Sequence, residues 1–85
     1  MIKAIILSRA WQLLTNKECL VHNNLGMTYQ ITYMDTMETP SNNAHYFEIG
    51  TVTEAQLYGN RGKPWLWVRK SNEKTAALTL SYYII

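Results

Sequence analysis

The strongest constraint on the fold is a segment of alternating polarity in residues 27–37. Large apolar and aromatic side chains fall on one face of an extended chain, and mainly polar ones on the other: Tyr29, Ile31 and Tyr33 against Thr28, Gln30 and Thr32. This period of two predicts a half-buried β-strand. The Pro40-containing turn residues 38–43 follow, and residues 45–50 suit a returning strand. We therefore expect an antiparallel hairpin here.

Residues 2–7 form a short apolar run that is rich in isoleucine. A run without alternation suits a strand that is buried on both faces. We expect it to be a central strand of the sheet.

Residues 8–25 favour an amphipathic helix. Ser8 can cap the helix, Gly26 can end it, and the positions at three- and four-residue spacing are Trp11, Leu14, Glu18, Val21 and Leu25. A second signal competes, because Thr15 and Glu18 fit a capping box that would start the helix at residue 16 and leave residues 10–14 extended. The periodicity agrees better with the longer helix.

A second hairpin is expected from residues 63–70 and 75–85, with its turn at residues 71–74. Together these elements predict an α+β fold, a small, mostly antiparallel β-sheet of about five strands with one main N-terminal helix packed on one face. With 85 residues, the chain has enough apolar surface for one small core. Residues 1–85 should therefore form a single compact domain.

Charge is sorted along the chain. Residues 59–85 carry five basic residues against one acidic residue, whereas residues 1–58 carry three basic and five acidic residues. The basic segment also holds two tryptophans, and basic grooves with aromatic rings are typical of proteins that bind single-stranded nucleic acid. The candidate nucleic-acid-binding residues are Arg61, Lys63, Arg69, Lys70, Lys74, Trp65 and Trp67.

The loop length of the second hairpin decides which way the two tryptophans face. An even loop places Trp65 and Trp67 with Leu78 and Leu80 in the core, and this register matches apolar partners best. An odd loop places them with Arg69 on an exposed face, where they could stack on bases. The sequence leaves both arrangements open.

Two tyrosines near the end of the predicted last strand, Tyr82 and Tyr83, are candidate protein-interaction residues. Exposed aromatic side chains are common in protein interfaces, and an edge strand can pair with a strand of another chain. A protein interface is therefore the alternative to nucleic-acid binding.

The sequence holds no set of residues that predicts catalysis, a cofactor or a metal. Cys19 and His22 would share a helix face, but only His45 remains as a third ligand. Cys19, a histidine and Asp35 could form a nucleophilic set, yet any small chain offers such a trio. We expect a protein that is not an enzyme and that needs no cofactor or metal.

The single cysteine favours a reducing compartment, and the apolar run at residues 2–7 is too short to cross a membrane. We expect a cytoplasmic protein without membrane contact, a monomer or a homodimer. Its overall profile resembles the small accessory proteins of bacteriophages and other mobile elements, many of which occupy a host protein or nucleic acid. By that resemblance, it would act in the host cytoplasm as an inhibitor of a host nucleic-acid-processing or defence system, bound to RNA, single-stranded nucleic acid or a host protein.

Overall fold

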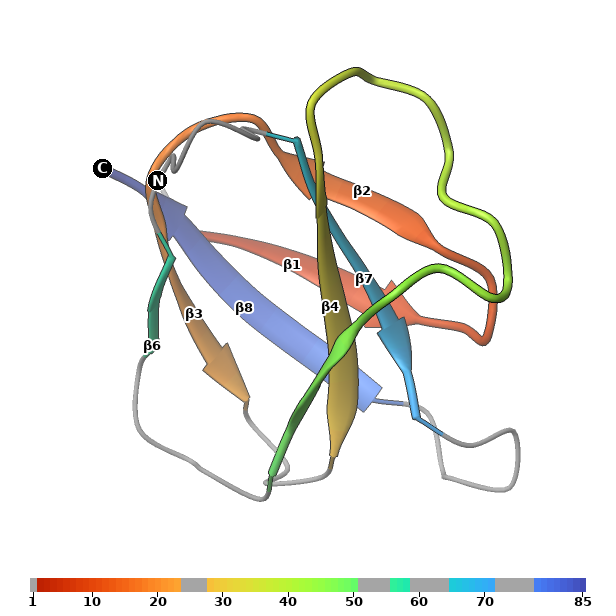
Figure 1. Cartoon of the computed structure of the whole chain (residues 1–85). Helices are drawn as coiled ribbons and strands as arrows, with labels where there is room; N and C mark the ends of the chain where they lie inside the picture. The colour runs from red at the N-terminus through yellow and green to blue at the C-terminus, as the bar shows by residue number, and fades with distance from the viewer. Residues whose placement is uncertain (1, 24–27, 51–55, 59–64, 72–77) are drawn as a thin grey trace.

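The computed structural model describes residues 2–23, 28–50, 56–58, 65–71 and 78–85. All the regular secondary structure in these residues is β-strand. They form two four-stranded antiparallel sheets (Figure 1). The first sheet has the order β1-β8-β3-β6 and consists of β1 (Ile2–Leu7), β8 (Leu78–Ile84), β3 (Cys19–Asn23) and β6 (Gln56–Tyr58). The second sheet has the order β2-β7-β4-β5 and consists of β2 (Gln12–Thr15), β7 (Trp65–Lys70), β4 (Tyr29–Met34) and β5 (Phe47–Ile49).

The core lies between the inner faces of the two sheets. Its buried members are Leu7, Leu14, Cys19, Val21, Tyr29, Ile31, Leu66, Val68, Leu78 and Leu80. The hydroxyl groups of Tyr29 in the second sheet and Tyr58 in the first are hydrogen-bonded at 2.8 Å. Burial raises the pKa of both phenols, so this neutral pair joins the two sheets.

The predicted N-terminal helix is wrong. Residues 12–15 form β2 and residues 19–23 form β3. Of residues 10–14, which the competing capping box would leave extended, only 12–14 lie in a strand, and the helix that should follow them is not formed. The hydroxyl of Thr15 accepts a hydrogen bond from the Lys17 amide, so the capping signal marks a turn between strands. In β3, Cys19 and Val21 point inward and alternate with Leu20 and His22, which point outward. Such a short apolar run fits the helix period of about 3.6 as well as the strand period of about two, which is why the sequence pattern favoured a helix.

The first hairpin is confirmed and the second is wrong. Strands β4 and β5 pair antiparallel, with Ile31 opposite Phe47. Strand β7 pairs with β2 and β4, whereas β8 pairs with β1 and β3 in the other sheet. The fold is therefore all-β, with two sheets, and the expected α+β class with one sheet under a helix is incorrect.

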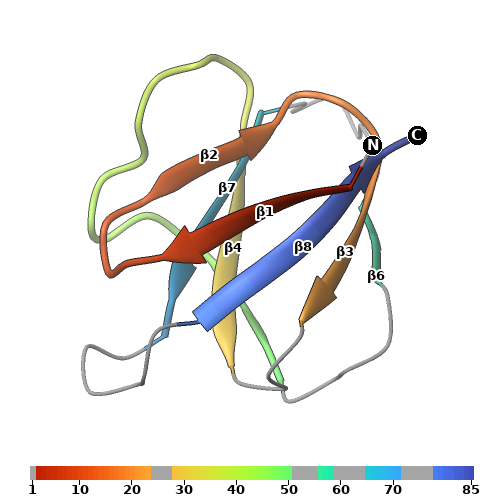
Figure 2. The same cartoon turned by 180° about the vertical axis from the view of Figure 1, so that it is seen from behind.

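Strand β1 exists as predicted, but it lies at an edge of the first sheet, where β8 is its partner (Figure 2). The side chains of Ile2 and Ile6 are exposed. The prediction of a central strand buried on both faces is therefore wrong, because only one face of β1 packs on the core.

Candidate functional site

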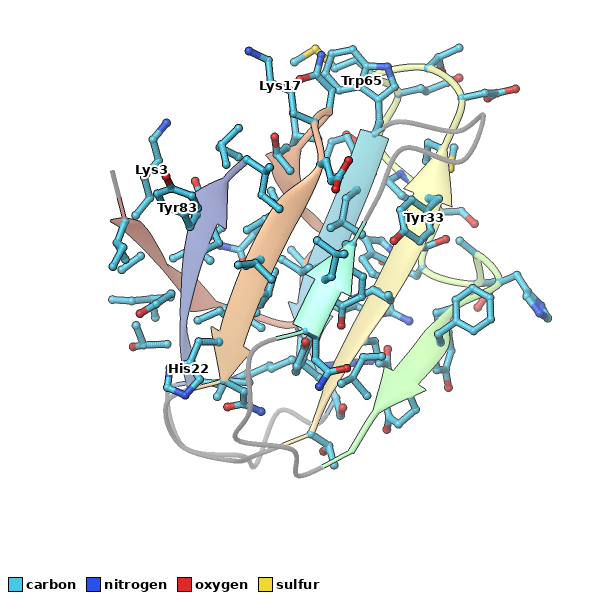
Figure 3. All side chains as sticks on the ribbon, turned by 90° about the vertical axis from the view of Figure 1, so that its left-hand side faces the viewer. Lys3, Lys17, His22, Tyr33, Trp65 and Tyr83 are labelled. Carbon is cyan, nitrogen blue, oxygen red and sulfur yellow. The ribbon has the colours of Figure 1, made fainter. Side chains whose placement is uncertain are left out.

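Strand β7 carries the residues of the predicted stacking platform. Leu66 and Val68 point into the core, so Trp65, Trp67 and Arg69 share the outer face of the second sheet. Trp67 and Arg69 are nevertheless only 6% and 3% exposed. Trp65 is half-buried and lies at the start of β7, at the top of the molecule in Figure 3. We call the outer face of this sheet the covered face.

Arg69 lies between two aromatic rings. Its guanidinium carbon is 4.1 Å from the ring centre of Trp11 and 5.4 Å from that of Tyr46. Arg69 Nε donates to Gln30 Oε1 at 2.7 Å, and a terminal nitrogen donates to the Asn42 carbonyl at 3.3 Å. Burial, followed by the charge of Arg9, lowers the Arg69 pKa, but a guanidinium keeps its proton in a protein. Arg69 is therefore an internal cation that organises this face.

The loop of residues 35–46 covers this face. In Figure 1 it is the yellow-green segment that leaves β4, arches past β2 and β7, and returns to β5. Trp11 Nε1 donates to the Ser41 carbonyl at 3.0 Å, the Thr32 hydroxyl donates to the His45 carbonyl at 2.7 Å, and Pro40 is buried. We call residues 35–46 the covering loop.

The predicted cationic surface is only partly described. Arg61, Lys63 and Lys74 lie outside the described residues. Lys70 is half-buried at the end of β7, and Arg69 is enclosed by Trp11, Tyr46 and the covering loop. Of the seven predicted nucleic-acid-binding residues, the structure brings Trp65, Trp67 and Arg69 to one face, and two of these three are closed off from bases.

The two candidate tyrosines point in opposite directions. Tyr82 packs against the core, and Tyr83 is 45% exposed on the outer face of the first sheet. Because β8 lies between β1 and β3, its own edge is not open to another strand. Tyr83 can therefore contact a partner through its ring, but not through strand pairing along β8.

Tyr83 belongs to an apolar surface that sequence analysis missed. The register places Ile2 and Leu20 on either side of Tyr83, and Leu57 beyond Leu20. Residues directly opposite in antiparallel strands share a face, so these four form a row across the sheet. Ile2 is 73% and Leu57 is 58% exposed, and exposed Ile6 and Ile85 extend the surface. We call these six residues the open face.

The open face has no charge within its strands. Its remaining outward positions hold Ala4, Thr79, Ser81 and His22, with no Lys, Arg, Asp or Glu in the described strands. A hollow of about 290 Å³ lies on it, lined by Ile2, Leu20, His22, Ser81, Tyr82 and Tyr83. Figure 3 shows Tyr83 and His22 along this side of the molecule. The hollow has room for a large apolar side chain of a partner.

The residues considered for metal binding or catalysis do not come together. Cys19 points into the core and His22 points outward, because they are three apart on a strand and not on a helix. Burial, with a smaller effect of Glu18, raises the Cys19 pKa to about 11, so its thiol is protonated near neutral pH. Within the described ranges, no three His, Cys, Asp or Glu side chains gather into a group suited to a metal ion.

Comparison with known proteins gives no relative: no family model, no curated protein and no solved structure matches the chain. Within the residues that the structure describes, no helix is long and apolar enough to span a membrane.

Proposed function

We propose that this chain is a non-enzymatic protein-binding module that docks a partner on the open face. The observation that carries the proposal is the solvent exposure of Ile2, Ile6, Leu57, Tyr83 and Ile85 on one sheet face, whose described strands turn no Lys, Arg, Asp or Glu outward. Monomeric soluble proteins rarely expose contiguous apolar patches larger than roughly a few hundred Å², and larger patches mark interaction sites.

The chemistry of the face defines the kind of partner. A Lys, Arg, Asp or Glu brought against it would lose water without gaining an opposite charge. A partner with a flat apolar surface and one protruding Leu, Phe or Trp side chain would instead fill the hollow beside Tyr83. Inhibition of a host protein by occupation of its surface is the biological role that we propose for such a module.

The experiment is a capture from a bacterial host lysate, with and without nuclease. We expect one stoichiometric partner that survives nuclease treatment and is lost with Leu57→Lys. Phe47→Lys is the matched control, because Phe47 is 59% exposed but lies on β5 of the second sheet. Equal retention by the two variants would contradict the proposal.

Nucleic-acid binding remains the competing proposal, and it depends on Arg61, Lys63 and Lys74 together with Lys70. It predicts capture that nuclease abolishes, and affinity for a labelled RNA that falls steeply with salt. The double variant Arg61→Glu, Lys63→Glu should abolish that affinity, whereas Leu57→Lys should leave it unchanged. The same two experiments therefore separate the two functions.

A further inference from the structure

The open edge of β1 is a second interaction surface, which adjoins the open face at Ile2 and Ile6. In the described part of the chain β1 pairs with β8 alone, and Ile2, Lys3, Ala4 and Ile6 are all exposed. An exposed apolar edge strand is a template for pairing with another strand, and stable proteins cover or block such edges.

The side chain of Gln12 shows which peptide groups face this edge. Gln12 Nε2 donates to the Ile6 carbonyl at 2.9 Å, and Gln12 Oε1 accepts from the Ser8 amide at 2.8 Å. Peptide groups of consecutive residues in a strand point to opposite sides. The even-numbered residues of β1 therefore turn their N–H and C=O groups to the open edge, and the odd-numbered ones turn theirs to β8.

Gln12 also limits the length of the open edge. The side-chain amide of Gln12 occupies the Ile6 carbonyl and the Ser8 amide, so the peptide groups left to an incoming strand run from residue 2 to the Ile6 N–H. Ala4 is the centre of this stretch. The outward side chains of residues 2–6 are Ile2, Ala4 and Ile6, and this pattern is the same in both chain directions.

We propose that a second copy of this chain pairs antiparallel along β1, with the two-fold axis at Ala4. Ile2 of each chain then lies opposite Ile6 of the other, and Ala4 lies opposite Ala4, which are the residues whose peptide groups face the edge. Lys3 lies opposite Ile5 of the second chain, so the two lysines are not directly opposed. The two first sheets become one continuous sheet.

The first test places like charges on the two-fold axis. We expect sedimentation velocity to show the mass of two chains for the wild-type protein at high concentration and of one chain for Ala4→Lys or Ala4→Glu alone. Mixing these two variants should restore the dimer. Tyr83→Lys is the matched control and should leave the dimer intact. If the Tyr83→Lys variant were monomeric, self-association would instead be assigned to the open face.

The second test reads the register through a disulfide, in a Cys19→Ala background. Opposed Cα atoms in a hydrogen-bonded antiparallel pair are about 5.5 Å apart, within the range of a disulfide. Ala4→Cys should therefore form a covalent dimer on mild oxidation, whereas Lys3→Cys should not, since those Cα atoms would be about 7–8 Å apart. A chain that stays monomeric at all concentrations, or equal cross-linking of both variants, would overturn the proposal.

Discussion

The outer faces of the two sheets reverse the usual burial preferences of charged and apolar side chains. The covered face encloses Arg69, a cation, whereas the open face leaves Ile2 and Leu57 in solvent. Arginine is rarely buried in proteins and isoleucine commonly is. The difference between the faces comes from the path of the chain, because the covering loop returns across the second sheet, and the open face receives no such cover from the described residues. Side-chain type alone is therefore a poor guide to which surface of a small all-β protein remains available for binding.

Removing the internal cation is the strongest test of this comparison. Arg69→Ala would leave Gln30 Oε1 and the Asn42 carbonyl without their donor and would open a space between Trp11 and Tyr46. We expect a loss of about 2–4 kcal/mol in the free energy of unfolding, measured by urea denaturation. Lys70→Ala on the same strand is the control and should cost less. Equal costs would mean that Arg69 does not organise the covered face.

The next largest effect is expected at Trp11. Trp11→Phe removes the hydrogen bond to Ser41 and weakens the contact with Arg69, so it should cost about 1–2 kcal/mol in thermal or chemical unfolding. Trp67→Phe is the matched control, because Trp67 Nε1 is buried with no hydrogen-bond partner in the part of the chain described. Removing an unsatisfied donor should offset the lost ring area, and a larger cost at Trp67 than at Trp11 would contradict the described contacts.

A pair of threonines compares the two faces directly. Thr32→Val deletes the hydrogen bond that fastens His45 of the covering loop while keeping the side-chain shape, and it should cost about 1 kcal/mol. Thr79→Val makes the same change on the outward side of β8 and should stay within about 0.5 kcal/mol of the wild type. Amide hydrogen exchange in residues 35–46 should rise for Thr32→Val alone.

The smallest effect on stability is expected on the open face. Leu57→Lys and Ile6→Lys replace side chains that are more than half exposed, so each should change the free energy of unfolding by no more than about 0.5 kcal/mol. Binding of an apolar fluorescent dye should fall in both variants. A cost of several kcal/mol would show that these side chains are packed in solution, and the contrast between the two faces would then be lost.

Sequence reasoning succeeded where the signal was local. The alternation of Tyr29, Ile31 and Tyr33 correctly marked a strand and its inward face, and the nearby turn correctly predicted its pairing with residues 47–49. It failed at residues 8–25, because short apolar runs fit both strand and helix periods. The open face does leave a trace in the sequence, because residues 2–7 carry isoleucine at both even and odd positions, but the same pattern is also typical of a strand that is buried on both faces.

The partners of Arg69 could not have been predicted in this way. Gln30 and Arg69 lie 39 residues apart, and nothing in the local pattern around either one refers to the other. The alternation did place Trp65, Trp67 and Arg69 on a common face. Whether that face met water, bases or the chain's own loop depended on residues 35–46, which the sequence marked only as turn chemistry at residues 38–43.

The amino-acid sequence by itself determined where several strands run and which side chains share a face, because alternation is a property of the extended backbone. Only the tertiary structure decided which strands are neighbours, which sheet face the loop covers, and that β1 is an edge. Those outcomes depend on contacts between residues distant in the chain, where many pairings satisfy the same local pattern and the packing of the whole molecule selects among them.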